Sequence, residues 1–159
     1  GGNNGKPTEK NLYKDGEAVL KWVSKNTNFT KDQIIIYGES LGSGVAVELG
    51  TKYNFLSIVL EAPFTSIYDI ANKRYKIYPA KFLVKDKFDN LSKIDRLKSP
   101  LLILSGKKDE IVPHYHSLLL LNKAKVIKKG VFIDEAIHNN LYDFGIEKDV
   151  ISFNLTLWK

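Results

Sequence analysis

The stretch that decides the fold reads Ile34-Ile35-Ile36-Tyr37-Gly38-Glu39-Ser40-Leu41-Gly42-Ser43-Gly44. An apolar, β-branched run ends in a glycine-flanked turn and passes into Val45-Ala46-Val47-Glu48-Leu49, which predicts a strand, a sharp turn and a helix. Gly38-Glu39-Ser40-Leu41-Gly42 in this position indicates a nucleophile elbow, because two glycines permit a turn too tight for a Cβ. Such a turn raises the Ser40 hydroxyl above the sheet and presents the Leu41 backbone N–H to a developing oxyanion. The competing interpretation is a glycine-rich turn with an incidental serine.

Composition indicates one globular domain and argues against several classes of partner. The 159 residues are 43% hydrophobic, which is ample for a core, and no apolar run approaches the length of a membrane span. There is no cysteine, so disulfides and thiolate metal sites are excluded. The net charge of +6 comes almost wholly from lysine, since Arg74 and Arg96 are the only arginines. Nucleic-acid readers favour arginine, so we expect no nucleic-acid partner and leave membrane association open.

The chain alternates helical and apolar strand patterns. Thr8 is a plausible N-cap for a helix whose stripe carries Leu12, Gly16, Val19, Leu20 and Val23. We expect strands at 34–37, 57–60, 101–104 and 130–133, and helices at about 41–53, at 114–123 and over the last residues, where Ile146, Val150, Phe153 and Leu157 recur at helical spacing. This alternation predicts a parallel sheet with flanking helices.

Residues 62–99 break the alternation. They scatter aromatics among lysines with no sustained period and are expected to form a small cap inserted in a single domain that spans 1–159. The aromatics are either the lining of an acyl or peptide pocket or the anchors of the cap, and the sequence favours neither. They are Phe64, Tyr68, Tyr75, Tyr78, Phe82 and Phe88.

Three chemically suited side chains follow predicted strands. In an open parallel sheet, sites form at the carboxyl ends of the strands, where Ser40, Asp109 and His138 are expected to meet. His138 can take the Ser40 proton and return it to a leaving group, while Asp109 fixes the imidazole tautomer. The chain order of serine, acid and histidine is the one this fold uses. The chemistry requires no metal and no organic cofactor.

Each assignment has a rival. Glu110 or Asp134 can replace Asp109 as the acid, and Asp109 can serve only as a turn cap. His138 competes with His114 and His116, which we expect to face solvent at a helix start, and a metal site at this His-x-His lacks further ligands.

Four motifs in order resemble a known family: Tyr-Gly-Glu-Ser-Leu-Gly at 37–42, Glu-Ala-Pro-Phe-Thr-Ser at 61–66, Gly-Lys-Lys-Asp-Glu-Ile-Val-Pro at 106–113 and His-Asn-Asn at 138–140. They are similar to the small-cap serine hydrolases of the α/β-hydrolase fold, related to protein depalmitoylases and serine aminopeptidase-like esterases. The resemblance covers nearly the whole chain. It implies that Ser40 is the nucleophile, Asp109 the acid and His138 the base.

The sequence departs from that family in two places. The approach to the histidine usually carries glycines where this chain has Glu135 and Ile137, which is expected to alter the loop that aims His138. The first strands of the family, and the loop that supplies its second oxyanion N–H, would lie upstream of residue 1. The chain is therefore expected to be the carboxyl-terminal part of a hydrolase. The strand at 34–37 would then have an unpaired edge, which favours a homo-oligomer, aggregation or pairing with a missing partner.

Two functions remain open at this point. The first is a serine hydrolase that cleaves an ester, thioester or small amide of a small-molecule or acylated substrate through a Ser40 acyl-enzyme. Its activity would be reduced, because the loss of one oxyanion donor costs a factor of about 100 to 1000 in turnover. The second is a catalytically silent remnant that serves as a binding or assembly module.

Overall fold

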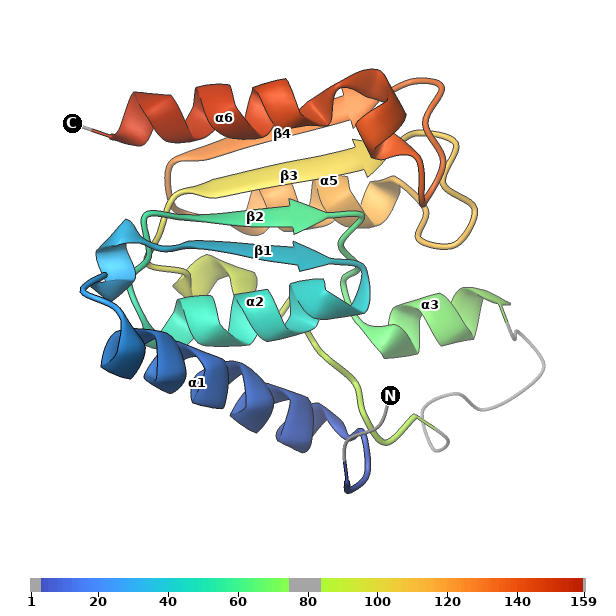
Figure 1. Cartoon of the computed structure of the whole chain (residues 1–159). Coiled ribbons are helices and arrows are strands. Elements are labelled where there is room, and N and C mark those ends of the chain that lie inside the picture. Colours follow the sequence, from blue (N-terminus) through green and yellow to red (C-terminus); the bar gives the residue numbers. More distant parts are fainter. Residues whose placement is uncertain (1–3, 75–83, 159) are drawn as a thin grey trace.

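A computed structural model describes residues 4–74 and 84–158. The elements are a set of α-helices, short 3-10 helices and one parallel sheet (Figure 1). In chain order they are α1 (Glu9–Asn26), η1 (Lys31–Gln33), β1 (Ile35–Glu39), α2 (Leu41–Lys52), β2 (Ser57–Glu61), α3 (Ile67–Arg74), η2 (Ile94–Arg96), β3 (Leu101–Gly106), α5 (Tyr115–Lys123), β4 (Lys128–Ile133), η3 (Leu141–Phe144) and α6 (Ile146–Leu157). The four predicted strands are present, and each extends one or two residues beyond its predicted carboxyl or amino end.

The sheet has the order β1-β2-β3-β4, and every neighbouring pair is parallel. All four strands therefore end on the same side of the molecule, as the alternation of strands and helices predicts. In the part of the chain that the structure describes, β1 is an edge strand. Its residues pair with β2 on one side only, in the register Ile35 with Ser57 through Glu39 with Glu61.

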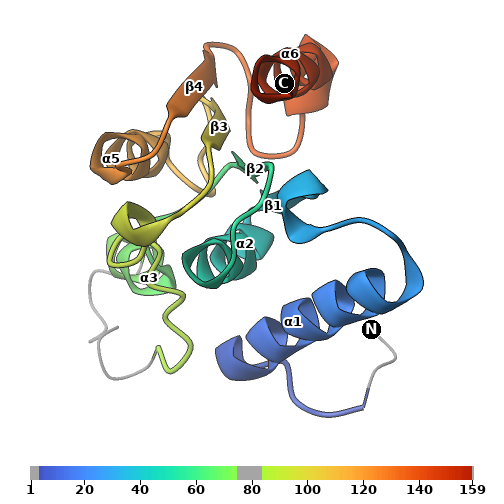
Figure 2. The ribbon, with the colours of Figure 1, turned by 90° about the vertical axis from the view of Figure 1, so that its left-hand side faces the viewer.

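Helices cover both faces of the sheet (Figure 2). Alternate residues of the central strands point to opposite faces, so Ile58 and Leu60 of β2 pack with α1, α2, η2 and α5, whereas Val59 packs with η3 and α6. The strand β3 repeats this division. Because both faces are covered, β2 and β3 are buried along their whole length, which explains why they read as unbroken apolar runs.

The first helix is capped as the sequence predicts, but its apolar stripe is narrower. The Thr8 hydroxyl accepts a hydrogen bond from the Asn11 N–H at 3.2 Å. Leu20 is buried against α2, whereas Val19 is 61% exposed. The inclusion of Val19 in the buried stripe was wrong, because Leu20 faces the core beside α2 and Val19, one position earlier, faces outward. The helices α1 and α2 lie side by side in Figure 2.

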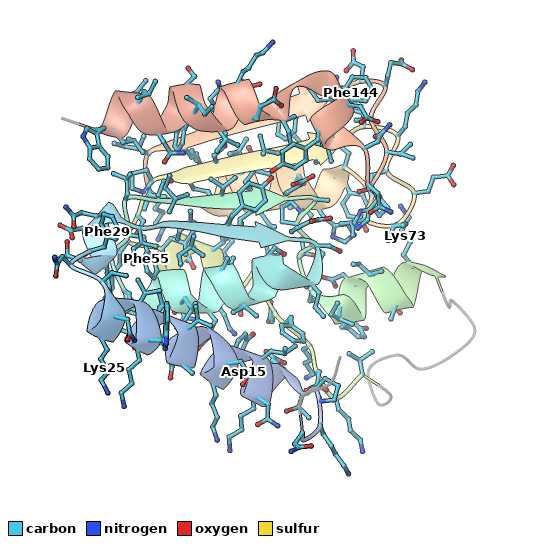
Figure 3. The ribbon with its side chains drawn as sticks, viewed as in Figure 1. Asp15, Lys25, Phe29, Phe55, Lys73 and Phe144 are labelled. Carbon is cyan, nitrogen blue, oxygen red and sulfur yellow. The ribbon has the colours of Figure 1, made fainter. Side chains whose placement is uncertain are left out.

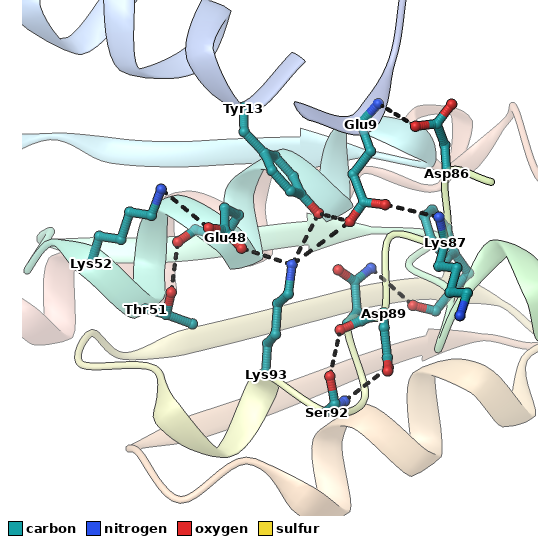
Figure 4. Close-up of polar contacts among 12 residues, drawn as sticks. Glu9, Tyr13, Glu48, Thr51, Lys52, Asp86, Lys87, Asp89, Ser92 and Lys93 are labelled. Carbon is teal, nitrogen blue, oxygen red and sulfur yellow. Dashed lines mark hydrogen bonds and ion pairs between the residues drawn. The ribbon is translucent and has the colours of Figure 1, made fainter. Parts of the chain in front are cut away.

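A polar cluster centred on Lys93 joins α1, α2 and the segment that leads to η2 (Figure 4). The Lys93 ammonium contacts Glu48 Oε2 at 2.7 Å and the Tyr13 hydroxyl at 3.1 Å, and it lies 4.6 Å from the centroid of the Tyr13 ring. Glu9 accepts a hydrogen bond from the Lys87 N–H, and its own N–H donates to Asp86. Segments far apart in the sequence are thereby tied together next to the sheet.

Phe64 and Phe88 settle part of the question about the aromatics in residues 62–99. Both are buried in a small cluster with Val112, against Leu12 and Tyr13, and so they anchor the segment. Tyr75, Tyr78 and Phe82 lie outside the described residues, and the assignment of residues 62–99 as a cap stays a prediction.

Candidate active site

The site lies at the carboxyl end of the sheet, where the predicted residues come from three different strands. Ser40 directly follows β1, Asp109 lies three residues after β3, and His138 lies five residues after β4. Phe144 and Lys73, which are labelled in Figure 3, lie at the same end of the molecule. Parallel pairing alone brings these loops together, because it aligns the strand ends.

The backbone at Ser40 is strained in the way that an elbow requires. Ser40 has φ 46° and ψ −114°, a conformation that a residue with a side chain rarely adopts. The turn is held by its neighbours, since the Ser40 N–H donates to the Glu61 carbonyl at 2.9 Å and the Ser40 carbonyl accepts from the Ser43 N–H at 3.0 Å. These bonds position the hydroxyl at the start of α2.

The two elbow glycines contribute unequally. A Cβ on Gly38 would lie 2.6 Å from the Gly42 carbonyl oxygen and 2.8 Å from the Ala46 Cβ, so a side chain is excluded there. A Cβ on Gly42 would meet no atom within 4 Å, which corrects the expectation that both glycines are needed for the tight turn. A Cβ on Gly44, further along α2, would lie 2.6 Å from the Phe88 ring, so a side chain is excluded there as well.

Ser40, His138 and Asp109 form a continuous hydrogen-bonded line. His138 Nε2 lies 3.0 Å from Ser40 Oγ, and His138 Nδ1 lies 2.7 Å from Asp109 Oδ2. Asp109 Oδ1 accepts two further bonds at 2.8 Å, from the backbone N–H groups of Ile111 and Val112. Both oxygens of this buried carboxylate therefore have hydrogen-bond partners, which fixes its orientation.

The loop that carries His138 passes directly over the end of β3. A Cβ on Gly106 would lie 2.2 Å from the Ala136 carbonyl oxygen, so only glycine permits this approach. The same carbonyl accepts the Lys108 N–H at 3.0 Å. Glu135 is exposed and forms an ion pair with Lys108. Despite the residues that replace the expected glycines, the loop delivers His138 to Ser40.

The remaining candidates lie elsewhere. Asp134 is exposed and pairs with Lys107 at 2.5 Å. Among the described residues, Asp109 and not Glu110 is the carboxylate bonded to His138 Nδ1. His116 is fully buried, which contradicts the expectation that it faces solvent. The helical phase of α5 turns it inward with Leu120, and its Nδ1 lies 2.8 Å from the Thr65 hydroxyl. His114 is half-buried against the Phe132 ring.

A cavity of about 680 Å³ opens beside the line of residues. Its walls mix apolar and charged side chains, and both Asp109 and His138 face it. The lining residues are Lys107, Lys108, Asp109, Glu110, Ile111, Ile137, His138 and Asn139. The Leu41 N–H lies at the first position of α2, where helical N–H groups have no partner within the helix and carry partial positive charge.

Within residues 4–74 and 84–158 no group of three or more His, Cys, Asp or Glu residues is arranged to hold a metal ion. Over the same part of the chain, no helix combines the length and apolarity needed to cross a bilayer.

Sequence reasoning missed a second polar group beside the site. The Tyr37 hydroxyl donates to the Glu61 carboxylate, and the Tyr142 hydroxyl donates to the Tyr37 hydroxyl at 3.3 Å. Burial raises the pKa of Glu61, although the hydrogen bond from Tyr37 opposes the rise. The sequence feature that could have revealed this group is Glu61, a carboxylate directly after the apolar residues Ile58, Val59 and Leu60 of a buried strand.

Comparison with known proteins places this arrangement in context. Residues 4–140 match the model of the prolyl oligopeptidase family. Alpha/beta hydrolase domain-containing protein 17B of Homo sapiens is 34% identical over 147 residues, which cover 91% of this chain and 49% of that protein. The 17C protein of Xenopus tropicalis is 30% identical over 141 residues, covering 89% of this chain and 44% of that protein. The chain thus spans about half the length of the curated relatives it matches.

Solved structures show the same fold. An acetyl xylan esterase from Paenibacillus sp. R4 superposes with a TM-score of 0.73 at 17% identity, covering 91% of this chain and 52% of the esterase. The monoacylglycerol lipase of Paleococcus ferrophilus superposes with a TM-score of 0.69 at 18% identity, covering 98% of this chain and 78% of the lipase.

Proposed function

The chain belongs to the prolyl oligopeptidase family and has the α/β-hydrolase fold, and from its site we propose that it is a serine hydrolase. The substrate is an ester, a thioester or a small amide of a small molecule or an acylated partner. The observation that carries the proposal is the line of contacts from Ser40 Oγ to His138 Nε2 at 3.0 Å and from His138 Nδ1 to Asp109 Oδ2 at 2.7 Å.

The proposed reaction has two halves. In the first, Ser40 Oγ forms a bond to the substrate carbonyl carbon while His138 Nε2 takes the hydroxyl proton. The imidazolium then gives this proton to the leaving group as the bond to that group breaks, which leaves an acyl-Ser40 ester. In the second half, water gives a proton to His138 and its oxygen bonds to the acyl carbon. The bond from that carbon to Ser40 Oγ then breaks, Oγ takes the proton back from His138, and the carboxylic acid leaves. Throughout both halves the Asp109 carboxylate accepts a hydrogen bond from the His138 Nδ1–H group and is not itself protonated.

The Leu41 N–H is the proposed donor to the oxyanion, and the N-terminal end of α2 adds partial positive charge to it. Among the described residues we assign no second donor. Because each oxyanion donor contributes a factor of about 100 to 1000 to turnover, we expect this chain to turn over more slowly than a hydrolase with two donors.

We also propose that residues 62–99 form a small cap over a single hydrolase domain. The support is the anchoring of Phe64 and Phe88 beside Val112, which lies in the loop that follows Asp109. The cap would then share a wall with the substrate cavity through Ile111.

The test is intact-mass labelling of the chain with a fluorophosphonate probe. We expect one adduct on the wild-type protein and none on Ser40→Ala or His138→Ala. The matched control is Ser152→Ala, since Ser152 is an exposed serine on α6 far from Ser40 in the sequence. Failure of folded wild-type protein to label, or labelling that survives Ser40→Ala, would refute the proposal.

A second candidate function is favoured by the edge of β1. A non-catalytic module that pairs β1 with β1 of a second copy would satisfy the outward N–H and C=O groups of both strands. The cavity of about 320 Å³ between β1 and α6 has no charged residue in its described lining and offers a mostly apolar surface beside this edge. Light scattering distinguishes the two: a dimer that Ile35→Lys dissociates supports assembly, and a monomer at high concentration excludes it.

A further inference from the structure

Three side chains link the histidine loop to the centre of the sheet. The Tyr142 hydroxyl donates to the Tyr37 hydroxyl at 3.3 Å, and the Tyr37 hydroxyl donates to Glu61 Oε2. Glu61 is 3% exposed, whereas Tyr142 is 57% exposed. The line thus runs from the surface to a buried carboxylate, and each hydroxyl donates toward that negative charge. Hydrogen bonds arranged in one direction polarise one another and strengthen the line.

Each member of the line is joined to the triad by a short length of backbone. Tyr37 lies on β1 three residues before Ser40, and Tyr142 lies in η3 four residues after His138. The Glu61 carbonyl accepts the Ser40 N–H at 2.9 Å. The contact between the two tyrosines therefore fastens the segment that follows the histidine to the strand that ends in the nucleophile.

The part of the histidine loop before His138 is held firmly, because Ala136 is fully buried over Gly106 and both Asp134 and Glu135 form ion pairs. Between β4 and η3 it holds an Ile137 N–H bond to Asn140 Oδ1 at 2.8 Å and the contact of the Ala136 carbonyl with Lys108. Ile137 itself is 49% exposed. Asn139, on the other side of His138, is also exposed, so the segment that follows the histidine depends on its own contacts to stay closed. The position of Nε2 relative to Ser40 Oγ then depends on how the segment after His138 is held.

Burial of the Glu61 carboxylate favours the hydrogen bond that holds the Tyr37 side chain in place. Burying a carboxylate without a hydrogen-bond donor costs free energy, and the Tyr37 hydroxyl donates to the Glu61 carboxylate. The other charged or titratable groups that act on Glu61 are Glu39 beside it on β1 and His138. The Tyr37 hydroxyl is consequently oriented toward Glu61, which leaves its oxygen free to accept from Tyr142.

We propose that Tyr142, Tyr37 and Glu61 are positioning residues that hold the His138 loop where Nε2 accepts the Ser40 proton. The three side chains act through His138 and do not touch the substrate carbonyl. This inference rests on the proposed hydrolase function and deepens it, because it identifies what aims the base in a loop that lacks the glycines usual at its approach.

The kinetic test compares Tyr37→Phe, Tyr142→Phe and the double variant on p-nitrophenyl acetate. Each single change should lower kcat at least about tenfold with KM unchanged, since a misplacement of about 1 Å costs about 100-fold. The double variant should be no slower than the worse single variant, because either change breaks the same line.

The matched control is Tyr13→Phe. The Tyr13 hydroxyl, like that of Tyr37, donates a hydrogen bond to a carboxylate, Glu9 at 2.7 Å, and burial raises the pKa of both tyrosines. Tyr13 differs in its position, since it lies in the cluster around Lys93. Tyr13→Phe should lower the unfolding temperature and leave kcat unchanged. If Tyr37→Phe and Tyr142→Phe behave as this control does, the inference is wrong.

Amide hydrogen exchange supplies a readout that does not need turnover. The peptide that contains Ala136 to Asn140 should exchange faster in Tyr142→Phe and Tyr37→Phe than in the wild-type protein. In Tyr13→Phe the same peptide should exchange at the wild-type rate. A wild-type chain that neither labels nor turns over would defeat the hydrolase proposal, while this measurement would still decide the role of the tyrosines. Unchanged exchange in both variants would overturn the inference.

Discussion

Asp109→Asn separates the chemical role of the acid from its structural role. Asp109 Oδ1 accepts the N–H groups of Ile111 and Val112, so the amide oxygen of an asparagine must occupy that position. The amide NH₂ group then takes the place of Oδ2, 2.7 Å from His138 Nδ1. Two donors cannot face each other, and Nδ1 must therefore lose its proton and become an acceptor.

The consequence appears at the other end of the imidazole. With Nδ1 unprotonated, the proton of the neutral ring resides on Nε2, which faces Ser40 Oγ at 3.0 Å. An Nε2–H group cannot accept the hydroxyl proton, and the ring is held in the wrong tautomer. This tautomer error costs a factor of about 10⁴ in turnover, or about 5.5 kcal/mol of transition-state stabilisation.

Stability should respond differently. Asp109→Asn keeps both backbone bonds, so the unfolding free energy should change little. Asp109→Ala leaves two N–H groups without an acceptor, at about 1–3 kcal/mol each. The measurement is the rate of fluorophosphonate labelling beside urea unfolding, with Asp134→Asn as the control, because Asp134 is an exposed acid paired only with Lys107.

We expect Asp109→Asn to be folded and nearly unlabelled, and Asp134→Asn to label at the wild-type rate. Wild-type labelling of Asp109→Asn would refute the tautomer argument. Loss of labelling in Asp134→Asn would show that the wrong carboxylate has been assigned.

Three further outcomes follow from contacts outside the triad. Gly38→Ala should unfold the elbow or abolish labelling, because its Cβ would lie 2.6 Å from the Gly42 carbonyl oxygen, whereas Gly42→Ala should be as stable as the wild type or up to about 1 kcal/mol more stable in urea unfolding. Lys93→Met should lower the unfolding free energy by about 1–3 kcal/mol, because it leaves Glu48 and the Tyr13 hydroxyl without their shared partner; an unchanged urea midpoint would contradict this. Burial alone would raise the pKa of Glu48, but the ion pairs with Lys93 and Lys52 outweigh burial and lower the pKa. The contribution of Glu48 to stability is therefore present above the ordinary glutamate value of 4.5 and is lost as the pH falls through the lower pKa of the folded state. Lys93→Met should therefore flatten the acid side of the plot of unfolding free energy against pH, and an identical acid slope in the two proteins would count against it.

Several features were predictable from local pattern because local physics decides them. The strands β2 and β3 read as unbroken apolar runs because both of their faces are covered. The strand-turn-helix at Ser40 was predictable from Gly38, whose missing side chain is needed for contact with α2. The candidates Ser40, Asp109 and His138 were predictable as a set, because parallel strands bring the loops at their ends to one edge.

Other features depend on which surfaces meet, and no local pattern contains that information. Solvent exposure of His116 was a reasonable expectation next to Pro113, but the phase of α5 and the position of Thr65 bury it. Whether the Val19 side chain faces solvent depends on which residues of α1 contact α2. The donors to Asp109 became visible only when the backbone of its own loop was seen to fold back on it.

Local patterns were enough to predict the fold class, the elbow and the three candidate residues, because strand burial and glycine geometry act over a few neighbouring residues and strand–helix alternation implies parallel order. Only the tertiary structure selected Asp109 over Asp134 and placed Tyr142 on Tyr37, since these contacts join residues 29 and 105 positions apart along the chain. Contacts at such separation are decided by how helices pack on the two faces of the sheet, and packing is a property of the assembled core.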